Sequence, residues 1–140
     1  METGQAFIHR SSAYLTGDYF PRIRRSLEGL SDEDVWWRPN DASNSIGNLL
    51  LHLAGNVKQW VVSGIGGAED TREREREFLQ AGGLSGPELL AHLEEALKDV
   101  EGVLEGLDPS ELLERRVIQG MHVSVMDALY HVVEHFSTHT

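Results

Sequence analysis

Three histidines in this chain have the residue type and the spacing needed to bind one metal ion. His135 and His139 are four residues apart on the apolar stripe of the last predicted helix, where apolar packing alone would not select an imidazole. Side chains four apart on a helix begin about 6 Å from each other, so both rings can reach one ion at roughly 2.0–2.1 Å. His52 lies at the edge of an apolar face on an earlier helix, and antiparallel packing would place it opposite His135. The pattern predicts one divalent ion held by three imidazoles, with positions left open for water or substrate, as in catalytic sites.

The same residues also fit a site without a metal. A cluster of buried neutral histidines, hydrogen-bonded to Asn48 and Asn56, would explain the pattern if every ring nitrogen found a partner. His131 lies one helical turn before His135 and could be a hydrogen-bond partner behind the ligands, a general base or an alternative ligand. Three other histidines lie beside polar or charged neighbours and are expected to be ordinary surface or half-buried residues: His9, His92 and His122.

Two further segments carry aromatic or charged residues. Trp36 and Trp37, in the predicted loop Ser31–Ser45, are expected to plug one end of the bundle, with a wall of the metal pocket as the alternative. Arg38 beside them is the basic group to consider for an anionic part of a substrate. The charged stretch Glu69–Glu77 has no apolar stripe, so we expect a solvated loop or a short exposed helical turn without a function.

Four amphipathic helices are expected to position these residues. Apolar residues recur at three- and four-residue steps, no segment alternates like a strand, and at least one connection must be long. The predicted helices run from Gly4 to Leu30, from Asn44 or Ser45 to about Gly64, from the N-cap Ser85 through Leu107, and from the N-cap Ser124 to the last residue. Pro21 falls inside the first helix, where we expect a bend or a break. The fold class predicted is all-α, a four-helix bundle with long connections, in one domain spanning residues 1–140.

Composition excludes several partners and cofactors. The formal net charge of -11 at pH 7 would repel phosphate backbones, so no nucleic-acid partner is expected. The chain has no cysteine, so disulfides, thiolate ligands and a cysteine nucleophile are excluded, and a metal site must use nitrogen and oxygen ligands. No apolar run approaches the roughly 18 residues of a membrane span, and the N-terminus lacks the pattern of a signal peptide. We therefore expect a cytoplasmic protein without a membrane partner.

Two longer motifs give the chain a family resemblance. Residues 44–56, NSIGNLLLHLAGN, and residues 130–140, YHVVEHFSTHT, resemble the DinB/YfiT-like superfamily in order and spacing, and the resemblance covers nearly the whole chain. The WWRP run at 36–39 and the sequence Ile118-Gln119-Gly120 are similar to an uncharacterised branch of that superfamily.

The resemblance implies a four-helix bundle with a metal, commonly zinc or nickel, held by one histidine of the second helix and two of the last. Carried onto this chain, these ligands are His52, His135 and His139. Several members are thiol-dependent transferases or isomerases in which the metal activates the thiol of a small cofactor such as bacillithiol or mycothiol, and many form homodimers. Members usually continue past the last histidine into another helical stretch. If the sequence ending at Thr140 is shortened relative to them, we expect a weakened metal site and dimer contact.

Three functions follow from the residues and the resemblance together. The preferred one is a thiol-dependent S-transferase, in which the metal lowers the pKa of a coordinated thiol or water and presents the anion to an electrophilic small molecule. The nearest enzymatic alternative is a metal-dependent hydrolase with His131 as general base. The third is a non-catalytic, metal-stabilised binding or dimerisation module. Thiol dependence of turnover would separate the first two.

Overall fold

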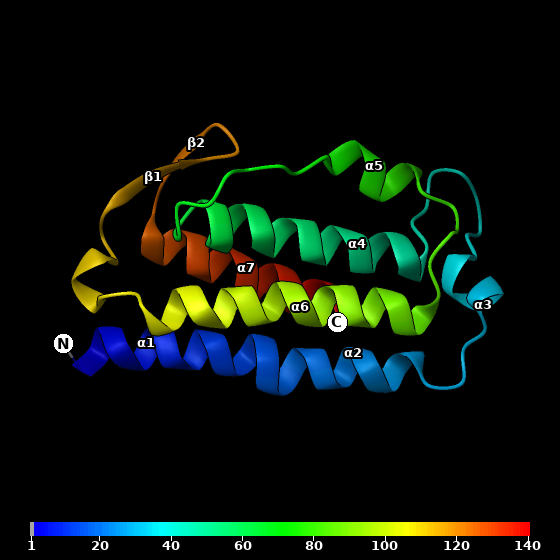
Figure 1. The fold of residues 1–140 in the computed structure, drawn as a ribbon, viewed down its shortest axis with the longest axis horizontal. Helices are drawn as coiled ribbons and strands as arrows, with labels where there is room; N and C mark the ends of the chain where they lie inside the picture. Colours follow the sequence, from blue (N-terminus) through cyan, green and yellow to red (C-terminus); the bar gives the residue numbers. More distant parts are fainter. Residues whose placement is uncertain (1) are drawn as a thin grey trace.

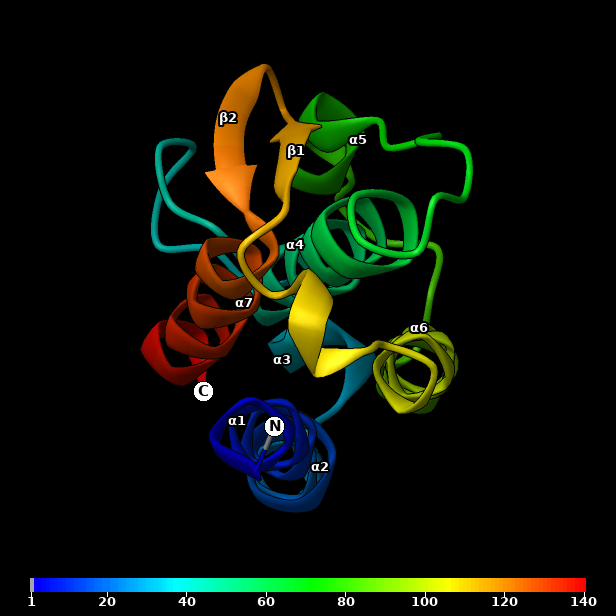
Figure 2. The ribbon, with the colours of Figure 1, turned by 90° about the vertical axis from the view of Figure 1, so that its left-hand side faces the viewer.

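Four long helical rods enclose the apolar core of the protein (Figure 1). The computed structural model describes residues 2–140. The rods are, in chain order, α1 (Glu2–Ser12) continuing through η1 (Ala13–Tyr19) and α2 (Phe20–Leu27); α4 (Ile46–Val57) continuing through η2 (Lys58–Ser63); α6 (Gly86–Glu105); and α7 (Val125–His139). Figure 2 shows them end-on, with α4 between α6 and α7. The predicted all-α four-helix bundle is confirmed.

The direction of the rods explains the long connections. The first rod and α7 run one way along the bundle, whereas α4 and α6 run the other way (Figure 1). Because α4 and α6 are parallel, the chain must return along the bundle between them, and the segment 64–85 does so. This segment contains the short helix α5 (Arg74–Leu79), which lies against the outer side of α4. The antiparallel pairing of α4 with α7 is the arrangement expected to bring His52 opposite His135.

The helix starts are set by serine caps, as predicted. Ser45 accepts a hydrogen bond from the backbone N–H of Asn48, and the Asn48 side chain accepts one in return from the backbone of Ser45. Ser124 and Asp127 form the same reciprocal pair at the start of α7. Such caps satisfy amides that have no partner within the helix, so they fix where α4 and α7 begin and therefore which face each histidine occupies.

Pro21 widens the first rod without breaking it. The residues before the proline form the π-helical segment η1, in which the backbone N–H of Phe20 donates to the carbonyl of Leu15. A proline removes one backbone donor and crowds the preceding turn, and a wider turn relieves that crowding. The irregularity that the sequence predicted at Pro21 is therefore a π-helical stretch within a continuous rod.

Several short elements were absent from the sequence-based prediction. The expected loop after the first rod contains α3 (Asp32–Trp36), and the connector before α7 contains η3 (Pro109–Glu111) and an antiparallel hairpin. The hairpin pairs β1 (Arg115–Ile118) with β2 (Met121–Ser124). Its two-residue turn has positive φ values of 52° at Gln119 and 75° at Gly120. The expectation of no strand was wrong because each strand has four residues, too few for an alternating pattern to stand out.

The hairpin leads directly into α7. The backbone N–H groups of Val125 and Met126 donate to the carbonyls of Glu114 and Leu112, at 3.0 and 2.8 Å. These bonds satisfy two amides in the first turn of α7 that have no acceptor within the helix.

The two adjacent tryptophans have different environments at the α3 end of the bundle. The indole N–H of Trp36 donates to the carbonyl of Leu84 at 2.8 Å, and its ring lies so close to Gly47 that a Cβ there would overlap it. Trp37 is 65% exposed. The plugging role predicted for the pair therefore applies to Trp36 alone.

None of the helices in residues 2–140 has the length and apolar character needed to cross a membrane.

Candidate metal centre

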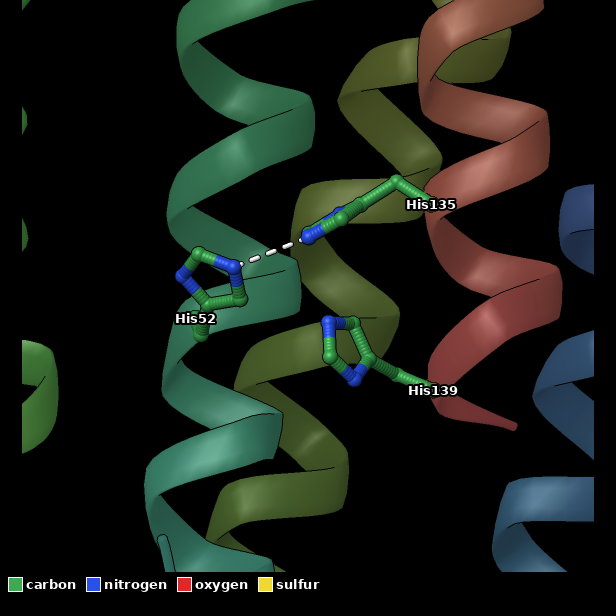
Figure 3. A group of neighbouring side chains, drawn as sticks. All are labelled: His52, His135 and His139. Carbon is green, nitrogen blue, oxygen red and sulfur yellow. Dashed lines mark hydrogen bonds between the residues drawn. The ribbon is translucent and has the colours of Figure 1, made fainter. Parts of the chain in front are cut away.

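The three predicted histidines meet in the space between α4 and α7 (Figure 3). His52 comes from the middle of α4 and is 8% exposed, whereas His135 and His139 come from the last turns of α7 and are half-buried. The residues that flank them toward the core, including Leu53 and Phe136, are fully buried or nearly so. Apolar packing on both helices therefore fixes the faces from which the imidazoles project.

The ring nitrogens are close enough to share one ion. The Nε2 atoms of His52 and His135 are 2.8 Å apart, and one ligand nitrogen from each of the three rings lies within 4.8 Å of the others. The rings of His135 and His139 meet edge to face, with centroids 4.7 Å apart. Two nitrogens bound to one ion at about 2.0–2.1 Å can be at most ~4.2 Å apart, so closing the site needs a shift of less than about 1 Å. Three imidazoles are a donor set that fits a first-row divalent transition-metal ion.

The local environment keeps two of these rings neutral. Burial, followed by repulsion from His52, His139, His131 and Arg72, lowers the pKa of His135 to about 3. Burial and His52 also lower the pKa of His139. A neutral imidazole has the lone pair that a metal requires, so little competition from protons is expected at neutral pH.

A purely hydrogen-bonded cluster does not satisfy the rings. The Nδ1 atom of His135 is buried and has no hydrogen-bond partner among residues 2–140. Asn48, expected to serve the histidines in that interpretation, instead uses its amide for the helix cap and for the carbonyls of Glu77 and Gln80. The Asn56 side chain is hydrogen-bonded to His131. The metal-free interpretation requires a hydrogen-bond partner for every ring nitrogen, and Nδ1 of His135 has none among residues 2–140.

His131 lies one turn behind His135, outside the group of three. Its ring packs against Trp60 with the two planes tilted by 33° and the centroids 4.1 Å apart, and its Nε2 atom is 3.3 Å from the side-chain nitrogen of Asn56. The Asn56 side chain can donate to this nitrogen through its amide NH2 group. If the amide is flipped, its oxygen can instead accept a hydrogen bond from the protonated nitrogen. The roles suggested for His131 stay predictions, and its contacts are those of a residue that packs behind the ligands.

Two functional candidates, Arg72 and Glu77, were missed by sequence reasoning. The expectation of a solvated segment at Glu69–Glu77 was wrong for this pair, because the Arg72 side chain is 4% exposed and Glu77 is 8% exposed. Glu77 Oε1 lies 3.1 Å from Nδ1 of His52. Although burial raises the pKa of Glu77, hydrogen bonds from His52 and Arg72 outweigh burial and lower it. The carboxylate at the back of His52 is thus ionised.

The remaining candidates lie apart from this centre. His9, His92 and His122 are exposed. Arg38 forms no ion pair within residues 2–140, and the arginine that does reach the histidines is Arg72. Charge alternation along a segment does not reveal which of its charged residues turn inward, so the sequence offered no signal to choose Arg72.

Comparison with known proteins agrees with this fold. Residues 3–140 match the family described as protein of unknown function DUF1572, and the chain belongs to that family. No curated protein matches the chain.

Two solved structures share the fold at low sequence identity. One, from Enterococcus faecalis, is described as the conserved protein of a locus; it has 13% identity and a TM-score of 0.73, with 94% of this chain and 89% of that chain covered. The other is a DinB-like protein from Bacillus cereus with 14% identity and a TM-score of 0.71, covering 94% of this chain and 83% of that chain. The DinB-like fold expected from the sequence motifs is therefore confirmed.

Proposed function

We propose that this protein binds one divalent metal ion with His52, His135 and His139 and catalyses thiol-dependent S-transfer to an electrophilic small molecule. The observation that carries the proposal is the convergence of three imidazoles from two helices, with ligand atoms within 4.8 Å of one another. Three histidines leave coordination positions open, which is typical of catalytic metal sites. Zinc and nickel are both suited to this donor set.

The chain's own residues limit the chemistry. A bound divalent ion supplies Lewis acidity, which lowers the pKa of a coordinated thiol or water. Because the chain contains no cysteine, a thiol nucleophile must be a separate small molecule. The half-buried positions of His135 and His139 leave one side of the cluster accessible to such a co-substrate.

A largely apolar cavity lies beside His139, which supports a substrate whose electrophilic group carries an uncharged substituent. The cavity has a volume of about 140 Å³ and lies where α2, α4 and α7 meet. Most of its lining is apolar and includes Ile23, Leu49 and Leu53. Ser26 and Thr140 contribute hydroxyl groups, and no charged side chain lines it. A cavity of about 150 Å³ with an apolar lining accommodates a benzene molecule, so a small aromatic or branched aliphatic group would fit here.

A metal-dependent hydrolase is supported less well. Its general base would be His131, but Asn56 already engages Nε2 of that ring and Trp60 covers one face. A non-catalytic binding or dimerisation module would need no open coordination position and no adjoining cavity.

The first test is metal content. We expect near-stoichiometric zinc or nickel in untagged protein by elemental analysis, and loss of that metal in His52→Ala, His135→Ala and His139→Ala. His9→Ala, an exposed histidine on α1, is the matched control and should keep the metal. A parent protein that stays metal-free after incubation with zinc or nickel would refute the metal site.

The metal-loaded parent should then consume an electrophile that carries a small aromatic group and a leaving group only when a low-molecular-weight thiol is present. The thiol sulfur replaces the leaving group, so the products are the thioether and the released leaving group, which takes the thiol's proton directly or through solvent. Turnover without thiol would favour the hydrolase. Full metal occupancy with no turnover across a panel of thiols and electrophiles would favour the module.

A further inference from the structure

We propose that Glu77 and Arg72 form a positioning pair that holds His52 with its proton on Nδ1, so that the Nε2 lone pair faces His135 and His139. This inference rests on the proposed metal site and concerns residues that neither the motifs nor the family description assigns.

The contacts of the pair are specific and buried. Arg72 donates from Nε to Glu77 Oε2 and from Nη2 to Glu77 Oε1, both at 2.9 Å, in a two-point arrangement. Its third nitrogen, Nη1, donates to Gln59 Oε1 at 2.8 Å. The carboxylate that is fixed in this way reaches His52 Nδ1 at 3.1 Å. Two-point pairing of arginine with a carboxylate fixes orientation as well as charge, so Glu77 cannot turn away from the ring without breaking both bonds.

The surface of α4 is shaped to receive the carboxylate. Gly55 lies one turn after His52, and a Cβ at that position would overlap Glu77 Oε2 and approach Arg72 Nε to 3.0 Å. One turn before His52, the Asn48 side chain donates to the carbonyls of Glu77 and Gln80, each at 2.8 Å. The segment that carries the pair is thus attached to α4 on both sides of the histidine.

The proton on His52 decides whether the site can take a metal. Because the Nε2 atoms of His52 and His135 are 2.8 Å apart, one of them donates to the other in the metal-free protein. An ion shared by both rings needs a lone pair on each of these atoms. His52 meets this need when its proton sits on Nδ1, where Glu77 Oε1 accepts it.

Arg72 has a second role in this arrangement. Its Nη2 atom is 3.2 Å from His52 Nδ1, so it can donate to that nitrogen whenever the proton is on Nε2. The pair therefore offers His52 both an acceptor and a donor. The ionised carboxylate favours the Nδ1–H form, and the guanidinium offsets its charge so that the pair adds no net charge behind the ligand.

The decisive variant is Glu77→Gln, which keeps the size of the side chain and removes its charge. In the metal-free variant we expect ¹⁵N NMR to show His52 shifted from the Nδ1–H toward the Nε2–H tautomer. Zinc affinity, measured by competition with a chromophoric chelator, should fall about 10–100-fold. Glu75→Gln, an exposed acid on the same helix, is the matched control and should change neither quantity.

Two further variants keep the test decisive if Glu77→Gln folds poorly. Glu77→Asp retains the charge and should lose less affinity than Glu77→Gln, and Arg72→Lys retains the charge without the two-point contact and should also weaken zinc binding. Parent-like affinity and an unchanged His52 tautomer in a folded Glu77→Gln variant would overturn the positioning role. If the parent binds no zinc, the proposed metal site fails, whereas the tautomer measurement on metal-free protein still decides the role of Glu77.

Discussion

At the scale of single residues, protonation and metal binding compete for the same nitrogen atoms. The pKa of His135 is lowered to about 3, first by burial and then by neighbouring rings, whereas an exposed imidazole titrates near 6.5. Burial also lowers the pKa of His131 and of His139. In the folded protein, His131, His135 and His139 therefore resist protonation over the range in which the unfolded chain accepts protons.

This difference predicts acid destabilisation. A histidine with a depressed folded-state pKa contributes stability that is present above about pH 6.5 and is lost as the pH falls toward 3, because the unfolded state binds the proton first. For each proton taken up on unfolding, the free energy of unfolding falls by about 1.4 kcal/mol for every pH unit of acidification in that window. Urea unfolding of metal-free protein between pH 7 and pH 5 should show this slope.

Two histidine variants give the controls for the acid effect. His135→Gln should reduce the slope of stability against pH, and His9→Gln at an exposed position should leave it unchanged. Equal slopes in the parent and His135→Gln would contradict the assignment of the acid effect to this cluster.

The three histidines and the two charged residues behind them differ in how far the sequence predicts them. His52, His135 and His139 interrupt apolar stripes, and a polar residue on a core face calls for an explanation. Arg72 and Glu77 lie in a run of alternating charges in which neighbouring residues are solvated, so nothing in the pattern distinguishes them. Their burial depends on mutual neutralisation after α5 has docked on α4, which is a tertiary effect.

At the scale of elements, α4 is the component on which the site is assembled. Gly47 near the start of α4 leaves room for the Trp36 ring, and Gly55 near its end leaves room for the Glu77 carboxylate. These two glycines let large side chains pack directly on the helix backbone. The serine caps and apolar stripes of the rods were predictable because they are local. The hairpin and the inward face of α5 were not, because short elements gain their stability from the surfaces they cover.

Gly55→Ala should therefore weaken metal binding without changing a ligand or the Glu77 side chain itself. A mid-helix glycine replaced by alanine gains about 1 kcal/mol in helix propensity, but the new Cβ would displace the Glu77 carboxylate from His52. Displacing the carboxylate also disturbs the buried pair of Glu77 with Arg72, which outweighs the gain in propensity. We therefore expect the unfolding free energy to fall by as much as about 3 kcal/mol, together with a loss of zinc affinity close to that of Glu77→Gln.

Gly102→Ala on α6 is the control for Gly55→Ala, since a Cβ there meets nothing within 4 Å. It should raise stability slightly and leave zinc binding unchanged. Parent-like zinc affinity in Gly55→Ala would show that Glu77 adjusts without moving off His52.

At the scale of the whole molecule, the site joins the second and fourth rods of the bundle. His52 and His135 are 83 residues apart in the sequence, so the cluster exists only when the chain has folded. A ligand that binds the folded state alone stabilises it by about 2.7 kcal/mol at a free concentration of 100 times its Kd.

Zinc should therefore raise the melting temperature by roughly 10 °C for a chain of this size at that concentration. Calorimetry of the parent in zinc and in chelator would measure the shift. His52→Ala should melt at the same temperature in both conditions. A parent insensitive to zinc and nickel would indicate that the three rings do not hold an ion in solution.

The close contact between Trp60 and His131 also gives the protein an optical reporter. Trp60 is 2% exposed and lies beside the ring that precedes the metal ligands on α7 by one turn, whereas Trp36 and Trp37 lie at the α3 end of the bundle. Replacing those two by phenylalanine would leave a single buried indole next to the histidine cluster. Its emission should be blue-shifted by burial and quenched by an open-shell ion such as nickel, but not by zinc. The intrinsic fluorescence of Trp60 would then report metal occupancy without an added dye.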